Sequence, residues 1–315
     1  MISLKKQLNG IGVLGINRRN AEYTFKYNSR DRYPLVDDKL QTKKLATEAN
    51  IAVPELYGVI QTEYQVRHFA EMIEPHAEFA LKPSRGSGGK GILVIAGRSK
   101  DMYRSVDGSL LTREEVGYHL SNVISGMYSL GGQPDKALIE YRVQFDPVFE
   151  AISYQGVPDI RGIVFLGVPV MSMVRLPTRM SGGKANLHQG AIGAGIDIAT
   201  GRTLTAVWRN DIVSEHPDTG NPVTGVKIPN WEKLLKIVAQ CNELTGLGYI
   251  GVDLVLDKDK GPLILEINAR PGLNIQIANR SGLLPRLKLV EQYHTELVNL
   301  NDRIAFSKHN FAHRG

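Results

Sequence analysis

The sequence predicts an α+β fold with mostly antiparallel sheets. Segments with the patterns of helices and of strands are intermixed along the chain. Two strand-like segments flank a glycine loop at 82–91, and two more flank the short turn Asp257–Gly261. Strands joined by such short connections pair in antiparallel fashion, and intermixed elements of this kind are typical of the α+β class.

The composition indicates an ordinary packed protein in a reducing compartment. The chain of 315 residues is long enough for one large domain or two smaller ones. Its single cysteine, Cys241, excludes a disulfide framework and is expected to be a packed core thiol. No apolar stretch is long enough to span a membrane, and the segment Gly10–Ile16 is expected to be buried rather than a signal peptide. We therefore expect a cytoplasmic protein.

The net charge of +6 is not concentrated in any run of basic residues. Nucleic-acid binders usually carry a clustered basic stripe. We therefore expect no nucleic-acid partner.

The first half of the chain is expected to begin with a short segment without clear periodicity, residues 1–36. Asp37 is predicted to cap a helix that ends before Val53-Pro54. Thr112 and Glu115 form a capping box, which predicts a helix that continues to about Ser129. The other elements expected here are a helix at 66–75 and strands at 79–81, 92–95 and 137–143.

The second half is expected to contain more strands than helices. Residues 177–202 are rich in Gly, Ser and Asn and are predicted to form a long loop. Asn230 is predicted to cap an amphipathic helix, and a last helix is expected from about Leu284, followed by a frayed tail. The expected strands cover 160–166, 168–175, 249–256 and 263–269.

Three polar side chains in the last predicted hairpin suggest a metal site. Side chains alternate between the two faces of a strand, so Asp253 shares one face of the hairpin with Glu266 and Asn268. Two carboxylates and an amide are the hard oxygen ligands that Mg²⁺ prefers, and substrate phosphates usually complete its coordination. The spacing alone also suits a solvated polar face. The turn Ala269–Gly272 is expected to place Arg270 beside the carboxylates.

The glycine loop is the second functional feature. It is not a Walker A loop, since Gly91 follows Lys90, and a strand follows it where a dinucleotide fingerprint requires a helix. A flap between two strands can close its backbone N–H groups over phosphates, although a plain surface hairpin has the same pattern. The residues expected to take part are Gly86, Ser87, Gly88, Gly89 and Gly91.

The order of the motifs resembles that of the ATP-grasp superfamily, and more closely that of the alpha-L-glutamate ligases of the ribosomal-S6-modification type. The resemblance covers about residues 35–285. Sugar-transfer-associated ATP-grasp proteins are similar in having a short start. Five stretches carry the resemblance: Asp38–Thr42, Lys82–Gly91, Asp159–Arg161, Asn186–Gly190 and Glu266–Gly272.

The resemblance implies two α+β lobes that grip ATP, with the preceding domain of the family reduced or absent. The implied ATP-grasp domain is 37–285, with a nucleotide-binding lobe at about 66–143 and a catalytic lobe at about 144–285. Residues 286–315 would form a C-terminal helix and tail. The short start favours a homo-oligomer, in which a neighbouring subunit covers the open side.

The resemblance also assigns roles to individual residues. Lys39 and Lys82 would hold the α- and β-phosphates of ATP. Glu140 would lie at the adenine, whose edge the backbone of Tyr141, Arg142 and Val143 would read. Asp253, Glu266 and Asn268 would ligate two Mg²⁺ ions, with Mn²⁺ as the alternative metal. The implied catalytic group is Arg161, Lys184, Asn186 and Arg270, with Lys184 in place of the glutamate ligases' arginine.

The implied activity is ATP-dependent ligation of a carboxylate to an amine through an acyl phosphate. The expected substrates are a carboxylate acceptor, such as a cell-surface metabolite, and glutamate or a related amino acid. A phosphotransferase on the same fold and a nucleotide-binding regulatory subunit without turnover are the alternatives.

Overall fold

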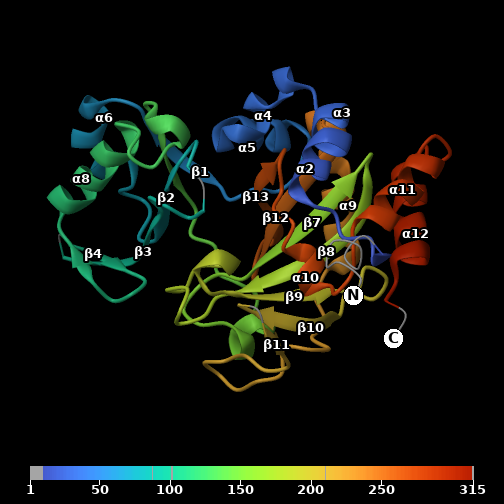
Figure 1. Cartoon of the computed structure of the whole chain (residues 1–315). Helices are drawn as coiled ribbons and strands as arrows, with labels where there is room; N and C mark the ends of the chain where they lie inside the picture. The colour runs from blue at the N-terminus through green and yellow to red at the C-terminus, as the bar shows by residue number, and fades with distance from the viewer. Residues whose placement is uncertain (1–9, 87, 101, 210, 314–315) are drawn as a thin grey trace. The chain divides into compact units, whose positions relative to one another are not determined.

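The computed structural model describes residues 10–86, 88–100, 102–209 and 211–313 (Figure 1). The chain forms two compact units. The larger unit comprises Met1–Asp37, Leu45–Ala52 and Phe145–Gly315, and the smaller unit comprises Asp38–Lys44 and Val53–Gln144. Among the helices of these described residues, none has the length and apolar character needed to cross a membrane.

The smaller unit is built on a six-stranded antiparallel sheet in the order β1-β6-β2-β3-β4-β5. The strands are β1 (Leu56–Ile60), β2 (Phe79–Pro83), β3 (Leu93–Ser99), β4 (Met102–Ser105), β5 (Leu110–Leu111) and β6 (Ala137–Glu140). Its helices are α6 (Glu63–Arg67), α7 (Phe69–Met72) and α8 (Arg113–Ile124). Helices α6 and α8 lie side by side, and α8 packs on β2 and β6 (Figure 1).

Helix α8 begins where the sequence predicts it but ends earlier. The capping box of Thr112 and Glu115 is present, and Val116, Leu120 and Val123 are fully buried in the core of this unit. The helix ends at Ile124 rather than near Ser129, because Gly126 has a φ of 90°. That left-handed conformation suits glycine and terminates a helix.

The larger unit is built on a seven-stranded antiparallel sheet in the order β11-β10-β9-β8-β7-β12-β13. The strands are β7 (Asp159–Phe165), β8 (Val168–Leu176), β9 (Ile192–Ile196), β10 (Thr203–Trp208), β11 (Asp211–Val213), β12 (Tyr249–Asp257) and β13 (Gly261–Asn268). Helix α9 (Trp231–Thr245) packs on β7, β8, β12 and β13, and its Cys241 is buried as expected. Two mostly antiparallel sheets with helices confirm the predicted fold class.

Strand β9 corrects the prediction of a long loop over residues 177–202. Every residue of β9 is buried, and α10 (Ile275–Ala278) packs against it. A Cβ on Gly195 would lie 2.7 Å from the carbonyl oxygen of Ala278 and 3.0 Å from the Cα of Asn279. The glycines that suggested a loop are therefore the residues that let α10 approach the sheet. The loop proper ends before Ile192 and contains one 3-10 turn, η5 (Leu187–Gln189).

The start of the described chain is more regular than the sequence predicts. Short helical segments follow one another as α2 (Ile16–Arg18), η1 (Arg19–Thr24), α3 (Phe25–Tyr27), η2 (Arg30–Arg32) and α4 (Pro34–Asp37), and η1 is a π-helix. The expectation that Gly10–Ile16 is buried is wrong, since Ile11 and Ile16 are 65% and 63% exposed. Within that stretch, Leu14 packs into the core.

Three further helix boundaries differ from the prediction. Helix α5 (Lys39–Glu48) has Asp38, not Asp37, as the side chain that accepts from its first turn, through the N–H of Leu40. Asn230 precedes α9 with a φ of 54° and forms no side-chain cap. The C-terminal part continues beyond α11 (Leu284–Tyr293) into α12 (Leu300–Phe311), because the Asn299 side chain caps α12 by accepting from the Asp302 N–H.

Gly195→Ala is predicted to destabilise the larger unit by about 1–3 kcal/mol, a typical cost of overpacking a tight contact. The added methyl group would push α10 away from β9. The free energy of unfolding from urea titration measures the effect. Gly15→Ala is the matched control, since a Cβ on Gly15 meets nothing within 4 Å. Equal stabilities of the two variants would show that the close contact between α10 and β9 does not affect the free energy of unfolding.

Candidate functional site

The hairpin of β12 and β13 brings the three predicted metal ligands together. Asp253 lies directly opposite Glu266, and Gly251 lies opposite Asn268. Asn268 Nδ2 is 3.4 Å from Asp253 Oδ2 and 3.3 Å from Glu266 Oε1. We refer to Asp253, Glu266 and Asn268 as the acidic cluster.

Two arginines surround the carboxylate of Asp253, which is 1% exposed. Arg161 donates from Nε and Nη2 to the two carboxylate oxygens, over 2.7 and 2.6 Å. Arg175 Nη2 lies 3.0 Å from Oδ2. Burial by itself would raise the pKa of Asp253, but the two guanidinium groups outweigh it and hold the pKa well below its usual range. Asp253 therefore stays ionised at neutral pH.

Arg175 is a site residue that the sequence analysis missed. It lies on β8 directly opposite Asp159 of β7 and donates to both oxygens of that carboxylate. Burial raises the pKa of Asp159 to about 7, with Arg175 acting against the shift and Asp253 adding to it. The signal for Arg175 lay in the hairpin itself, because strands at 160–166 and 168–175 place residue 159 across from residue 175.

The acidic cluster fits a magnesium ion by its donor chemistry. Among the described residues, no three His, Cys, Asp or Glu side chains form a metal site, and the cluster has two carboxylates and one amide. Mg²⁺ is commonly held by one or two carboxylates, with water and phosphate oxygens completing its shell. Asp253 Oδ1 accepts from Arg161 Nε, and a carboxylate oxygen has room for a second partner.

Arg270 does not contact the acidic cluster as the sequence analysis expected. Its guanidinium lies 3.2 Å from Asp37 and 5.0 Å from the centre of the Tyr33 ring. The basic groups that contact Asp253 are Arg161 and Arg175 instead. The turn after β13 therefore directs Arg270 towards the N-terminal helical segments.

The smaller unit contains a second buried ionic group. Glu140 at the end of β6 is 3% exposed, and it pairs with Lys82 of β2 and with Lys43 of α5 at 3.0 Å. Burial raises the pKa of Glu140, but both lysines act more strongly and hold the pKa below its ordinary value. Lys43 was missed by the sequence analysis, although it lies one turn after Lys39 on the same helix.

The glycine loop is anchored at its start. Lys39 Nζ donates to the Gly86 carbonyl over 2.6 Å. Asp135 accepts from the N–H of Arg85 at 3.0 Å and from Ser129 Oγ at 2.6 Å. Gly88, Gly89 and Gly91 all have φ between 65° and 74°, a region that favours glycine. Ser87, predicted as part of the flap, lies outside the described residues.

The segment after β6 and the loop after β8 hold the other predicted site residues. The N–H of Tyr141 donates to the backbone carbonyl of Glu55, Arg142 pairs with the carboxylate of Glu78 at 3.0 Å, and Val143 is half-buried. Lys184 is exposed in the loop before η5. Asn186 precedes η5 and accepts from the His188 N–H over 3.0 Å.

A match to a family model shows which family the chain belongs to. Residues 18–292 match the family model described as sugar-transfer associated ATP-grasp. The chain belongs to this ATP-grasp family. The predicted superfamily is thereby confirmed, and the matching branch is the sugar-transfer-associated one, which the sequence analysis had considered beside the glutamate ligases. No curated protein matches the chain in sequence.

The chain is similar to solved structures at low sequence identity. They include the ATP-grasp ligase PsnB complexed with minimal precursor, with 13% identity, a TM-score of 0.47 and 85% of this chain covered. The chain spans 63% of the length of PsnB. The D-alanine–D-alanine ligase from Bacillus anthracis has 15% identity and a TM-score of 0.45, with 90% of this chain and 70% of that one covered. The D-cycloserine synthetase DcsG has 14% identity and a TM-score of 0.43, with 84% and 71% covered.

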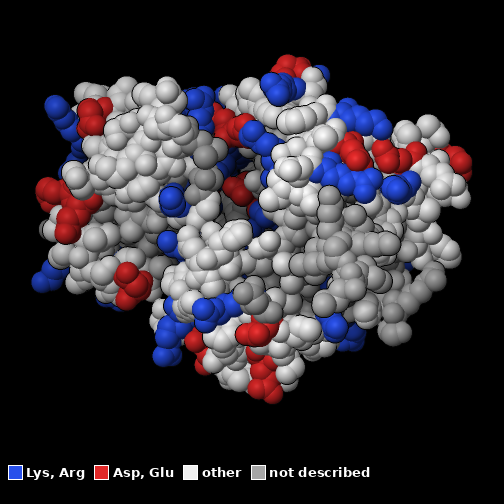
Figure 2. Space-filling view, viewed as in Figure 1, with Lys and Arg blue, Asp and Glu red and all other residues white. Residues whose placement is uncertain are grey.

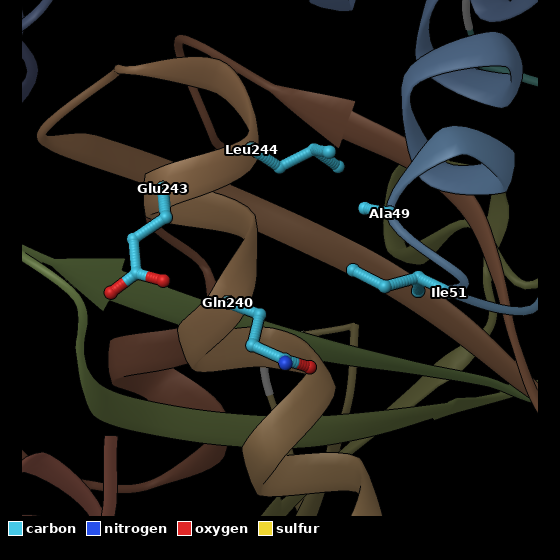
Figure 3. Close-up of a pocket in the computed structure, with 5 residues that line it drawn as sticks. All are labelled: Ala49, Ile51, Gln240, Glu243 and Leu244. Atoms are coloured by element: carbon cyan, nitrogen blue, oxygen red, sulfur yellow. The ribbon is translucent and has the colours of Figure 1, made fainter. Parts of the chain in front are cut away.

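A separate hollow of about 250 Å³ lies in the larger unit, between the end of α5 and helix α9 (Figure 3). Its only charged lining residue, Glu243, already pairs with Arg303 at 2.7 Å. None of its lining residues belongs to the clusters above. The five lining residues are Ala49, Ile51, Gln240, Glu243 and Leu244.

Figure 2 shows acidic and basic side chains interspersed over the visible face of the molecule.

Glu140→Gln is predicted to lower the free energy of unfolding of the smaller unit at pH 7 by about 3–5 kcal/mol, since it leaves two partly buried lysines without their carboxylate. The pKa of Glu140 is depressed in the folded state. Its stabilising contribution is therefore present above the unfolded pKa of about 4.3 and is lost as pH falls through the lower folded value.

Urea titrations at several pH values measure this effect. The deficit of Glu140→Gln relative to wild type should shrink as the solution becomes acidic. Glu71→Gln, at an exposed position of α7, is the matched control and should show no deficit at any pH. A deficit for Glu140→Gln that does not change with pH would contradict the assigned role of the buried carboxylate.

Proposed function

We propose that this ATP-grasp chain is an ATP- and Mg²⁺-dependent ligase that joins a carboxylate to an amine through an acyl phosphate. The observation that carries the proposal is the acidic cluster with its two arginines, in a chain of an ATP-grasp family. A fixed carboxylate pair beside guanidinium groups suits the transfer of a phosphoryl group, in which charge must be neutralised on transferring oxygens.

The smaller unit is proposed to bind the nucleotide. Lys39 and Lys82 would contact the α- and β-phosphates, and backbone N–H groups of the glycine flap would cover them. The backbone of Tyr141–Val143 would read the edge of adenine. Glu140 holds Lys82 and Lys43 side by side, so we assign to it the positioning of lysine charge, in addition to the adenine contact that the resemblance implies.

The larger unit is proposed to carry the reacting centre. Asp253, Glu266 and Asn268 would hold Mg²⁺, as two ions in the family pattern with Mn²⁺ as the alternative, and the metal would neutralise phosphate charge. Arg161 is fixed by Asp253 within reach of the same space. Lys184, Asn186 and Arg270 complete the set of groups proposed to contact the reacting acyl phosphate.

The proposed reaction has two steps. An oxygen of the substrate carboxylate attacks the γ-phosphorus of ATP, the bond from that phosphorus to the β,γ-bridging oxygen breaks, and ADP leaves. The amine nitrogen then attacks the acyl carbon, and phosphate leaves with the bonding electrons while the nitrogen loses a proton to solvent. We propose glutamate or a related amino acid as the amine.

The test is turnover by the purified chain with ATP, Mg²⁺ and mixtures of amino acids and sugar acids. ADP, inorganic phosphate and a new amide mass are the expected products. Formation of AMP would contradict the acyl-phosphate route. ADP with a stable phosphorylated product would indicate a phosphotransferase, and tight ATP binding without turnover a regulatory subunit.

Glu266→Gln is predicted to reduce turnover by at least about a hundredfold with the fold intact, because losing a metal-binding carboxylate removes several kcal/mol of charge stabilisation. Release of ADP under saturating ATP measures it. Glu296→Gln, an exposed position after α11, is the control of equal charge change. Full activity of Glu266→Gln would remove the acidic cluster from the mechanism.

A further inference from the structure

Arg19 is a buried arginine whose local contacts leave most of its donors unused. It lies in the π-helix η1 and is 8% exposed. Its Nε donates to Asn20 Oδ1 over 2.8 Å, and its Nη1 donates to the Pro271 carbonyl over 2.6 Å. Within the described residues, Arg19 pairs with no carboxylate. Since a guanidinium has five N–H groups, three of its donors have no acceptor from this part of the chain.

Two buried hydroxyl groups beside Arg19 also lack a partner. Tyr33 Oη and Tyr249 Oη are buried atoms without any hydrogen bond among the described residues. The Tyr33 ring lies 5.0 Å from the guanidinium of Arg270, the neighbour of Pro271, and Pro271 accepts from Arg19. Tyr249 lies two residues before Gly251, which Pro271 also contacts closely. Burial lowers the pKa of Arg19, while Tyr249 and Tyr33 act in the opposite direction. Buried polar groups are almost always hydrogen-bonded. The two hydroxyl groups therefore call for a partner that accepts hydrogen bonds, and the remaining N–H groups of Arg19 can donate to the same partner.

This group borders the face that carries the acidic cluster. Tyr249, Gly251 and Asp253 alternate on β12 and point to the same side of the sheet. A Cβ on Gly251 would lie 2.6 Å from Pro271, whose carbonyl holds Arg19. Asp253 follows Tyr249 by four positions along the strand, a distance of about 13 Å. The two places therefore lie on one face of the sheet, with Pro271 packed against the strand between them.

A purely structural role explains only part of these contacts. Arg19 does fix the turn after β13 through Pro271. That contact uses one of the five N–H groups and leaves the two phenol hydroxyls unexplained. The π-helix is a further sign, because such turns are rare and are frequently found at functional sites.

We propose that Arg19, Tyr33 and Tyr249 form a binding site for a substrate carboxylate that does not react. The planar fork of a guanidinium matches a carboxylate in two-point contact, and each phenol donates one hydrogen bond. The site selects substrates that carry an anionic group at the end remote from the reacting centre, such as an amino acid or a dicarboxylate. That the bound carboxylate belongs to the substrate rests on the proposed function, whereas the binding of an anion at this site does not.

The experiment measures binding without ATP, so its failure is distinct from a failure of the proposed ligase activity. L-Glutamate, acetate and inorganic phosphate are titrated into wild type, Arg19→Gln and Arg18→Gln, with binding followed by calorimetry. Arg18 is the neighbouring exposed arginine, paired with Glu22 at 2.8 Å, so Arg18→Gln makes the same charge change outside the site. L-Glutamate should bind wild type and Arg18→Gln equally, and Arg19→Gln at least about tenfold more weakly, as expected for loss of a charged hydrogen bond.

Tyr33→Phe is a second variant of the same site, which tests glutamate binding if Arg19→Gln fails to fold. Tyr33 Oη has no hydrogen bond to lose in the described structure, so the variant should unfold at the wild-type urea concentration while binding L-glutamate several-fold more weakly. Unchanged glutamate affinity in Arg19→Gln or Tyr33→Phe would overturn the site. Binding of phosphate but not of L-glutamate or acetate would overturn the carboxylate assignment, as would no binding of any probe to wild type.

Discussion

The buried carboxylate of Asp253 is the constraint on which the larger unit's site depends. An ionised group that is 1% exposed needs cations and hydrogen bonds around it. Arg161 and Arg175 supply them from β7 and β8. Removing one partner of such a group costs about 3–5 kcal/mol. The register of β8, β7 and β12 is therefore linked to one network of charges around Asp253. Because β13 pairs with β12, that network also fixes the positions of Glu266 and Asn268.

The smaller unit contains the same arrangement, a buried carboxylate held by two basic side chains. Glu140 is a buried carboxylate between two lysines, and it holds two positive charges near the base of the glycine flap. In both units a buried ion of one charge orders side chains of the other. Such fixed charges need no reorganisation when a charged ligand arrives, which is the condition for electrostatic catalysis.

The parts of this protein that could be predicted from sequence are those with local signals. Alternation along two strands was enough to bring Asp253, Glu266 and Asn268 to one face, and a capping box was enough to begin α8. Strand β9 was missed because its glycines resemble a loop until α10 is known to pack on them. Arg175, Lys43 and Arg19 were missed since their partners lie elsewhere in the chain, and only strand register or tertiary packing reveals a buried pair.

In the proposed mechanism the acidic cluster holds the metal that accompanies ATP. Electron paramagnetic resonance of Mn²⁺, added with a non-hydrolysable ATP analogue, tests it directly in wild type and in Asp253→Asn. We expect a protein-bound, nucleotide-dependent Mn²⁺ signal in wild type that is lost in the variant, with both proteins folded by circular dichroism. The same bound Mn²⁺ spectrum in Asp253→Asn would contradict it.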